Sequence, residues 1–403
     1  MLSSCPVGAL DDSLDDSLTG SVTDSFADLD LLASRFRRWA DAHAEDLEPL
    51  TDHPLGDLDV AVAATAPVLR ALHDAGWTRL GWPVEASGLG GSPLQRSVIY
   101  DELAAAGYVV PEILSALEII GPMLVRHAPA LAAACLPATL RGEEWWCQGF
   151  SEPDAGSDLG SLRTRTVPDG PGFRLTGQKM WSSFGHIARW CCVLARTGDP
   201  DSGHRGLTMF WVDLTAPGVT VRPTPCASGR AETAEIFLDD VLVAGDHVIG
   251  GVGQGWAVVM YLLQFERGAY AWMRQAELHT ELQRLLAGPG DVPDAAAEVG
   301  DAYLALFALR SQALATTRRL YGGTDLGPEI SVDKILLATT EQRVADVARE
   351  LLWPGLEVDD GEPAATWRRL WAYSRITTIY GGAIEVQRDL VAERLLGLPR
   401  GRS

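Results

Sequence analysis

Lysine is almost absent from this 403-residue chain. It occurs only at Lys179 and Lys334, so arginine carries nearly all of the positive charge. We attribute this scarcity to genome composition rather than to chemistry. Acidic residues are in excess and give a formal net charge of −21. A chain this acidic is repelled by nucleic-acid phosphates and by anionic membrane surfaces, so neither partner is expected.

The six cysteines form no Cys-x-x-Cys pair. Adjacent Cys191 and Cys192 suit neither a disulfide framework nor a metal site, so we expect buried, reduced thiols and no bound metal. The sequence also lacks a basic N-terminal segment followed by an apolar stretch, the mark of a signal peptide. Its longest apolar region, 104–125, contains two prolines and two glutamates. These absences predict a cytoplasmic protein without a membrane span.

The texture of the chain changes twice, and its length exceeds what one core usually supports. Residues 1–30 are rich in Asp, Ser, Gly and Thr and are expected to form a mobile acidic tail. Residues 31–143 follow a helical pattern. Short β-rich runs separated by turn residues occupy 144–250, and the helical pattern returns over 251–403. No Gly-x-Gly-x-x-Gly string follows a strand, so nothing favours a Rossmann cofactor site.

One glutamate stands in an unusually apolar stretch. Residues 256–263 and 269–273 are all apolar, which predicts one helix across Trp256 to Trp272 that is hydrophobic on every side and therefore interior. Glu266 and Arg267 lie within it and point in different directions, so they cannot simply neutralise each other. A buried carboxylate has a raised pKa and can serve as a base. In the alternative, the helix surfaces for one turn and leaves Glu266 in solvent.

Four strings, in this order and at this separation, closely resemble the acyl-CoA dehydrogenase family of flavoenzymes. They are Gln-Gly-Phe-Ser-Glu-Pro-Asp-Ala-Gly-Ser-Asp at 148–158, Gly-Gln-Lys-Met-Trp-Ser-Ser at 177–183, Ile-Tyr-Gly-Gly-Ala-Ile-Glu-Val-Gln-Arg at 379–388 and Ala-Glu-Arg-Leu-Leu-Gly-Leu-Pro-Arg at 392–400. The resemblance implies a mainly α, α+β fold: an N-terminal helical domain, a central small β-barrel or sandwich, and a C-terminal four-helix bundle.

The resemblance also implies a catalytic base. In this family the base is a glutamate in one of two places. The commoner place corresponds to Gly381, which has no side chain to act. The other is the glutamate of a Glu-Arg pair on the first helix after the β-domain, which is Glu266 here. Both places address the same α-carbon, so Glu266 is the expected base.

A cofactor site follows from the same resemblance. It implies that Gln148, Phe150 and Ser151 lie along the ring of an FAD, that Trp181 packs on a face of the ring, and that Ser183 hydrogen-bonds flavin N5. The alternative for these residues is structural, with Trp181 as a strand core residue and the string that begins at Ser151 as a turn or helix cap.

Further contacts complete this site by resemblance. Gly382 is expected beside the cofactor. Ser157, Arg267 and Tyr380 are expected to bind the acyl-CoA substrate.

Three features of the family are missing from the half of the site that would hold the ADP moiety. No Arg-x-x-Phe-Gly string lies within 285–299, the sequence at 353–357 replaces a Gly-Gly-x-Gly element, and Ala383 stands where a threonine usually contacts phosphate. Similar losses are familiar in an actinobacterial subgroup that includes steroid side-chain dehydrogenases, and the string at 327–335 resembles that subgroup too. Those enzymes form mixed tetramers in which two different subunits share each FAD.

The resemblance therefore implies FAD-dependent oxidation of an acyl thioester to its α,β-enoyl product, with an electron-transfer flavoprotein as acceptor. The carrier is CoA or an acyl carrier protein, and the assembly is a homo-oligomer or a heterotetramer with a second subunit. In a homo-oligomer, Arg310, Arg318 or Arg319 could compensate for the missing phosphate contacts. Two rivals remain: a flavin monooxygenase or oxidase of the same fold, and a non-catalytic subunit of a mixed dehydrogenase.

Overall fold

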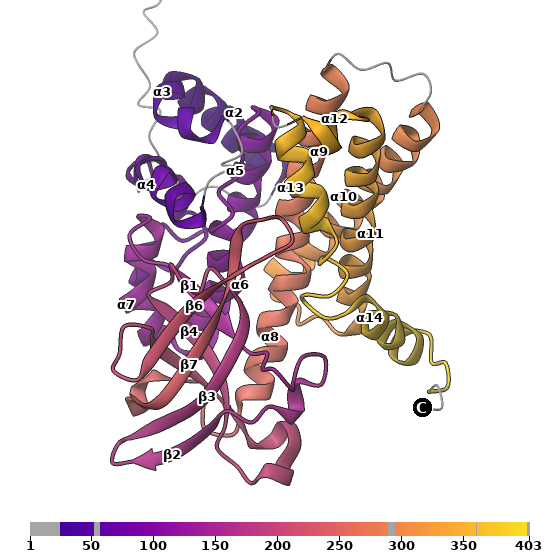
Figure 1. The fold of residues 1–403 in the computed structure, drawn as a ribbon. Helices are drawn as coiled ribbons and strands as arrows, with labels where there is room; N and C mark the ends of the chain where they lie inside the picture. The colour runs from indigo at the N-terminus through magenta and orange to yellow at the C-terminus, as the bar shows by residue number, and fades with distance from the viewer. Residues whose placement is uncertain (1–24, 52–56, 289–294, 360, 401–403) are drawn as a thin grey trace, which may run out of the picture.

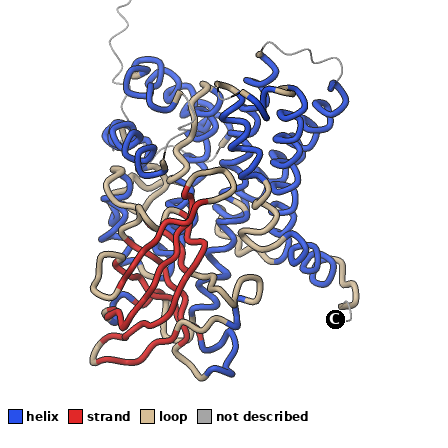
Figure 2. Tube along the Cα trace, in the orientation of Figure 1, coloured by secondary structure: helices blue, strands red, loops and turns tan. Residues whose placement is uncertain are grey.

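The computed structural model describes residues 25–51, 57–288, 295–359 and 361–400. Helices, then strands, then helices follow one another along the chain (Figure 1), and the β-sheet lies below the helices in the view of Figure 2. This order confirms the predicted fold class. The first described helix begins at Phe26, within the expected tail over residues 1–30, and Ser25 caps it. The rest of that expected tail, residues 1–24, lies outside the described residues.

The N-terminal block is a set of helices around an aromatic core. Its helices are α2 (Phe26–Ala42), α3 (Ala44–Leu47), α4 (Leu58–Asp74), α5 (Pro93–Ala105), α6 (Leu114–His127) and α7 (Pro129–Leu140). Phe36, Trp39 and Trp77 are almost completely buried and contact one another, with the Phe36 and Trp77 rings meeting edge to face at 5.1 Å. Burial of such large side chains supplies much of the stability of a helical block.

The middle block is one eight-stranded sheet. Its strands are β1 (Trp146–Gly149), β2 (Arg165–Asp169), β3 (Gly172–Ser183), β4 (Trp190–Arg196), β5 (Leu207–Asp213), β6 (Val219–Pro225), β7 (Ala231–Val243) and β8 (Val248–Ile249). They follow the order β6-β7-β3-β2-β4-β5-β8, and β1 pairs with β4 in parallel. Cys147, Cys191 and Cys192 are buried free thiols in this sheet, as the sequence predicts.

The C-terminal block is helical, and its helices α9, α10, α11 and α13 pack as a bundle (Figure 1). The helices are α8 (Gly255–Arg267), α9 (Ala269–Ala287), α10 (Ala296–Tyr321), α11 (Ser331–Leu351), α12 (Gly355–Val358), α13 (Ala364–Ser374) and α14 (Ile384–Leu390). No helix of the described ranges is long and apolar enough to cross a membrane.

The single helix predicted across Trp256 to Trp272 is wrong. Gly268 divides it into α8 and α9, with φ −101° and ψ −66°, and a β-carbon there would stand 3.0 Å from the Gln264 carbonyl oxygen and 3.0 Å from Thr316 of α10. Nor is α8 interior on every side, since Met260 is 37% exposed. As a result, Glu266 and Arg267 lie in the last turn of α8 rather than in mid-helix.

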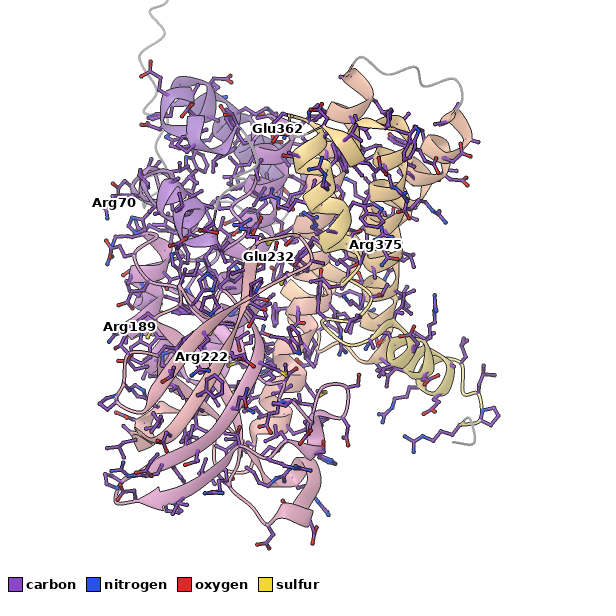
Figure 3. The ribbon with its side chains drawn as sticks, viewed as in Figure 1. Arg70, Arg189, Arg222, Glu232, Glu362 and Arg375 are labelled. Carbon is purple, nitrogen blue, oxygen red and sulfur yellow. The ribbon has the colours of Figure 1, made fainter. Side chains whose placement is uncertain are left out.

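Buried polar contacts join the blocks. Arg96 of α5 and Glu118 of α6 form an ion pair at 2.7 Å with both side chains almost fully buried, and Tyr321 of α10 donates to the same carboxylate at 3.4 Å. Figure 3 shows Glu232 where the β6–β7 hairpin reaches the C-terminal helices, and burial raises the pKa of this carboxyl to about 7. The Arg96–Glu118–Tyr321 contacts join the N-terminal helices to α10, and an ion pair of 3.3 Å between Arg230 and Glu112 joins the β6–β7 hairpin to the N-terminal block.

Candidate active site

Glu266 is a partly buried carboxylate at the end of α8. The preceding turns of the helix bury Val259, Leu262 and Phe265 and so anchor it to the protein interior. Burial raises the pKa of Glu266. The positive charges of Arg267 and Lys334 and a hydrogen bond with Gln148 act in the opposite direction. The alternative that leaves Glu266 in solvent is therefore not what the structure shows.

A tight turn at Gly381 and Gly382 faces this carboxylate. Both residues have positive φ, +64° and +100°, a conformation that glycine adopts readily and most residues do not. A β-carbon built at Gly381 would stand 2.9 Å from Oε1 of Glu266, and one at Gly382 would stand 2.3 Å from Nε2 of Gln387. Arg267 Nε donates to the Gly381 carbonyl oxygen at 3.1 Å. The positive φ of both residues favours glycine; Gly381 lies against Glu266 of α8, and Gly382 lies against Gln387 of α14.

Lys334 of α11 completes the surroundings of Glu266. The residue is 2% exposed, and its Nζ donates to the Thr377 carbonyl oxygen at 2.6 Å and lies 3.9 Å from the centre of the Tyr380 ring. Burial lowers the pKa of Lys334 to about 8, although the Glu266 charge favours the ammonium form. The sequence pattern does not single out this residue. The available signal is the rarity of lysine in a chain that otherwise uses arginine.

Trp181 is not part of the β-domain core. The register of β3 against β7 shifts between Lys179 and Ser182, and Trp181 lies in this irregular stretch with φ +59° and is 58% exposed. The alternative that makes it a strand core residue is wrong. Ser183 is exposed as well. A bulky residue held at positive φ with its ring in the open is a conformation more common at functional sites than elsewhere.

The second lysine links β3 to the loop after β1. Lys179 is fully buried, and its Nζ donates to Glu152 Oε1 at 2.7 Å and to the Phe150 carbonyl oxygen at 3.1 Å. Met180 N donates to the Ser151 carbonyl oxygen at 3.0 Å. The segment that begins at Ser151 does form a turn, closed by backbone hydrogen bonds between residues 152 and 155. That turn is part of the arrangement that brings residues 148–151 next to β3.

The structure gathers most, but not all, of the residues predicted for the site. Five of them surround the Glu266 carboxylate and the glycine turn: Gln148, Glu266, Arg267, Gly382 and Tyr380. The Tyr380 hydroxyl also forms a hydrogen bond of 3.5 Å with the hydroxyl of Tyr270. Phe150 and Ser151 follow Gln148 in the chain and contact Lys179 and Met180 of β3, and Trp181 and Ser183 come next along that strand. Ser157 is exposed in the loop that follows, and within the described residues no hydrogen bond or ion pair joins it to the others.

This arrangement suits proton abstraction next to a flat cofactor. It offers one carboxylate with a raised pKa, an exposed indole and a hydroxyl, which fit an aromatic heterocycle and a polarised carbon acid. No group of three or more His, Cys, Asp and Glu side chains in the described part of the chain is placed to hold a metal ion. The carboxylate of the site can supply acid–base chemistry, and its exposed indole offers a surface for a flat ring.

Gly381→Ala tests the close approach of the glycine turn to Glu266. The added β-carbon would stand 2.9 Å from Oε1 at a positive φ, so we expect a loss of about 1 to 2 kcal/mol in the free energy of unfolding, measured by urea denaturation. The control is Gly300→Ala in α10, where a β-carbon meets nothing within 4 Å and helix propensity favours alanine. Equal stability of Gly381→Ala and the wild type would refute the described turn.

Comparison with known proteins places this geometry in a family. Three family models match the chain in order: the N-terminal domain of acyl-CoA dehydrogenase over residues 28–143, the middle domain over 147–241 and the C-terminal domain over 253–396. Acyl-CoA dehydrogenase IpdE1 of Mycobacterium tuberculosis is 38% identical over 341 residues, which span 81% of this chain and 86% of the relative. Acyl-CoA dehydrogenase FadE34 of the same organism is 38% identical over 337 residues, which span 82% of this chain and 46% of the relative.

Solved structures agree with the sequence relatives. The Tcur3481-Tcur3483 steroid ACAD superimposes with a TM-score of 0.79 at 25% identity and covers 94% of this chain and 99% of its own. Acyl-CoA dehydrogenase from Geobacillus kaustophilus shares the fold with a TM-score of 0.74 at 22% identity over 92% of this chain and 99% of its own. The similarity to IpdE1, FadE34 and the Tcur3481-Tcur3483 steroid ACAD confirms the resemblance to the actinobacterial subgroup. Since all three family domains match in order, the chain belongs to the acyl-CoA dehydrogenase family of oxidoreductases.

Proposed function

We propose that this protein oxidises an acyl thioester to the trans-2-enoyl thioester with Glu266 as the catalytic base and FAD as the cofactor. The observation that carries the proposal is the contact between the Glu266 carboxylate and the turn at Gly381. The turn that holds the base in most members of the family here carries glycine, and the space left free is next to a carboxylate from α8. The Glu266 carboxylate thus lies where a glutamate at position 381 would otherwise act.

Glu266 is suited to remove the α-proton of a thioester. A general base works best when its pKa lies close to the working pH, and burial moves the pKa of this carboxyl upward from its ordinary value. Arg267 and Lys334 keep it from becoming permanently protonated. As the α-proton passes to Glu266, the β-hydrogen leaves as a hydride and the double bond forms between the two carbons. Arg267 and Tyr380 line the same space and are proposed to orient the substrate.

The residues of β1 and β3 fit the ring of a flavin. The indole of Trp181 is open on the surface of the bulge, and the hydroxyl of Ser183 is exposed two residues later. We assign Trp181 to stacking on the ring and Ser183 to a hydrogen bond at its edge, with Gln148, Phe150 and Ser151 alongside. When bound, the flavin accepts the hydride and passes its electrons on, in this proposal to an electron-transfer flavoprotein.

The acyl group is proposed to be carried on CoA. A steroid-derived acyl-CoA is the first candidate, since one neighbour at 25% identity is described as a steroid ACAD. Ser157 is proposed to contact the CoA from its exposed loop. An acyl-carrier-protein thioester is the alternative carrier, and fold alone does not choose between them.

Glu266→Gln tests the base. The amide is close in size to the carboxylate but accepts no proton, so we expect bound flavin and a loss of at least about 100-fold in the rate at which a panel of acyl-CoA thioesters bleaches it anaerobically. The control Glu85→Gln alters an exposed glutamate in the N-terminal block and should bleach at the wild-type rate. Near-normal bleaching by Glu266→Gln would remove Glu266 from the mechanism, and another group would then have to take the α-proton.

Trp181→Ala and Ser183→Ala test the cofactor assignment. Removing the exposed indole deletes a stacking surface, so flavin retention should weaken by roughly two- to tenfold, in keeping with about 0.5 to 1.5 kcal/mol for an aromatic pair beyond area burial. Ser183→Ala should slow flavin reduction while the thermal midpoint stays unchanged. Retention is measured by ultrafiltration and the flavin spectrum. Wild-type spectra and rates in both variants would contradict the placement of the ring beside β3.

We also propose that a second subunit completes the FAD site. Of the arginines that might compensate for the missing phosphate contacts, Arg310 is already ion-paired with Asp101 at 2.9 Å and Arg319 with Glu329 at 2.8 Å. A pyrophosphate needs charge-assisted donors. Large apolar side chains are also exposed on the C-terminal helices, among them Phe307 of α10 at 64%. Apolar exposure of this kind is typical of a surface that a partner covers.

The assembly is tested by light scattering after size exclusion, together with the ratio of FAD to protein. Expressed alone, the chain should retain FAD below one per subunit, and co-expression with a neighbouring acyl-CoA dehydrogenase subunit should restore it. A homotetramer with one FAD per subunit would eliminate the mixed assembly and leave the dehydrogenase proposal intact. Full FAD without bleaching by any thioester would instead favour a non-catalytic subunit.

A further inference from the structure

We propose that Lys334 is a positioning residue that keeps the Glu266 carboxylate ionised and directed at the space beside Gly381. The inference rests on the proposed role of Glu266 as the base. Its geometric basis is that both charged groups lie close to Gly381. A β-carbon built on Gly381 would stand 2.9 Å from Oε1 of Glu266 and 3.7 Å from Nζ of Lys334. Opposite charges from α8 and α11 thus border the same small space.

The ammonium group is held in place by two further contacts from the segment that leads into the glycine turn. Nζ donates to the Thr377 carbonyl oxygen at 2.6 Å, and it lies 3.9 Å from the centre of the Tyr380 ring. A cation over an aromatic face is stabilised by the ring, the more so when water is excluded. The buried ammonium group of Lys334 therefore contacts the backbone at 377 and the proposed substrate contact Tyr380, and it borders the same space as the proposed base.

The charged and titratable groups around Lys334 come from every side of its helix. From α8 come Glu266 and Arg267, from α11 itself Glu341, and from the segment before α14 Tyr380. The side of α11 that faces α10 presents Asp333 instead.

Three of these groups have other partners of their own. Arg274 binds Glu341 at 2.7 Å, and Arg267 donates to the Gly381 carbonyl oxygen at 3.1 Å. Asp333 accepts hydrogen bonds from Gln312 and Thr316 of α10. Of the charges around Lys334, that of Glu266 favours its ammonium form most strongly.

The two groups influence each other in opposite directions. Lys334 lowers the pKa of Glu266, and Glu266 raises the pKa of Lys334, each against the effect of burial. Such a pair titrates as a coupled unit. Below its pKa of about 8, Lys334 is charged and supports the ionised base. Above that pH the ammonium loses its proton and the support is withdrawn.

The sequence itself makes this coupling measurable, because the chain contains only two lysines. Protein labelled with carbon-13 at the lysine ε-carbon gives two signals in the spectrum of the holoprotein, and Lys334→Met assigns them. Lys179 serves as an internal control: it too is buried with a pKa of about 8, but its partner is Glu152 rather than Glu266. No substrate is needed, so the result does not depend on knowing the acyl group.

In the Glu266→Gln variant, the Lys334 signal should titrate at lower pH than in the wild type, while the Lys179 signal should keep its midpoint. Removing a negative charge near an ammonium makes the proton easier to lose, which gives the direction. Unchanged midpoints for both lysines would overturn the proposal. Equal shifts of both would also overturn it, because they would indicate a general change of the fold.

The pH profile of flavin bleaching separates positioning from mere structural support. On the acid side of the profile, the bleaching rate falls as the pH decreases; this acid limb should move to higher pH in Lys334→Met. The loss of bleaching rate relative to the wild type is then largest at acid pH and diminishes as the pH rises. Lys334→Arg keeps the charge and should restore the wild-type limb. The matched control Arg343→Met removes an exposed charge from the same helix and should leave the limb in place.

An unmoved limb in Lys334→Met, or Arg behaving like Met, would refute the proposal. If Lys334→Met does not fold, Lys334→Arg assigns the two signals instead, and the titration in Glu266→Gln decides alone. Failure of the proposed function has a different signature, since it would abolish bleaching by every thioester yet leave the lysine coupling intact.

Discussion

A carboxylate that must stay charged in a poorly solvated place is the constraint on which this site depends. Burial penalises the ionised form of Glu266, and an isolated buried charge would take up a proton instead. The surrounding structure opposes that penalty with two cations and an amide from three separate elements, and with a glycine turn that leaves room for the carboxylate. Any side chain at Gly381 would compete for the same space.

The rest of the fold brings those elements together. The break at Gly268 ends α8 at the Glu-Arg pair, and α9, which follows it, packs in the bundle. A buried lysine ties β3 to the loop after β1, and the same irregular stretch of β3 turns Trp181 outward. In this way the proposed base and the proposed ring-binding residues reach one region from blocks far apart in the sequence. Each block contributes a part that it could not use alone.

The order of helices and strands was readable from composition and periodicity, because these reflect which faces are buried. The importance of Gly381 was also readable, since a residue without a side chain cannot be a base. The role of Lys334 was not, because its place over the Tyr380 ring and near Glu266 arises only when distant helices pack. The break at Gly268 escaped prediction for a related reason: apolar residues continue on both sides of it, and one glycine within an apolar run does not mark a helix end by itself.

The central claim is that Glu266 takes the α-proton of a thioester. It is tested most directly by single-turnover, anaerobic flavin reduction with an acyl-CoA deuterated at the α-carbon, compared with the protiated form over a range of pH. The account predicts a slower reaction for the deuterated form and a rate that falls at acid pH with a midpoint above that of an ordinary glutamate. Equal rates for both forms, with no fall at acid pH, would contradict it.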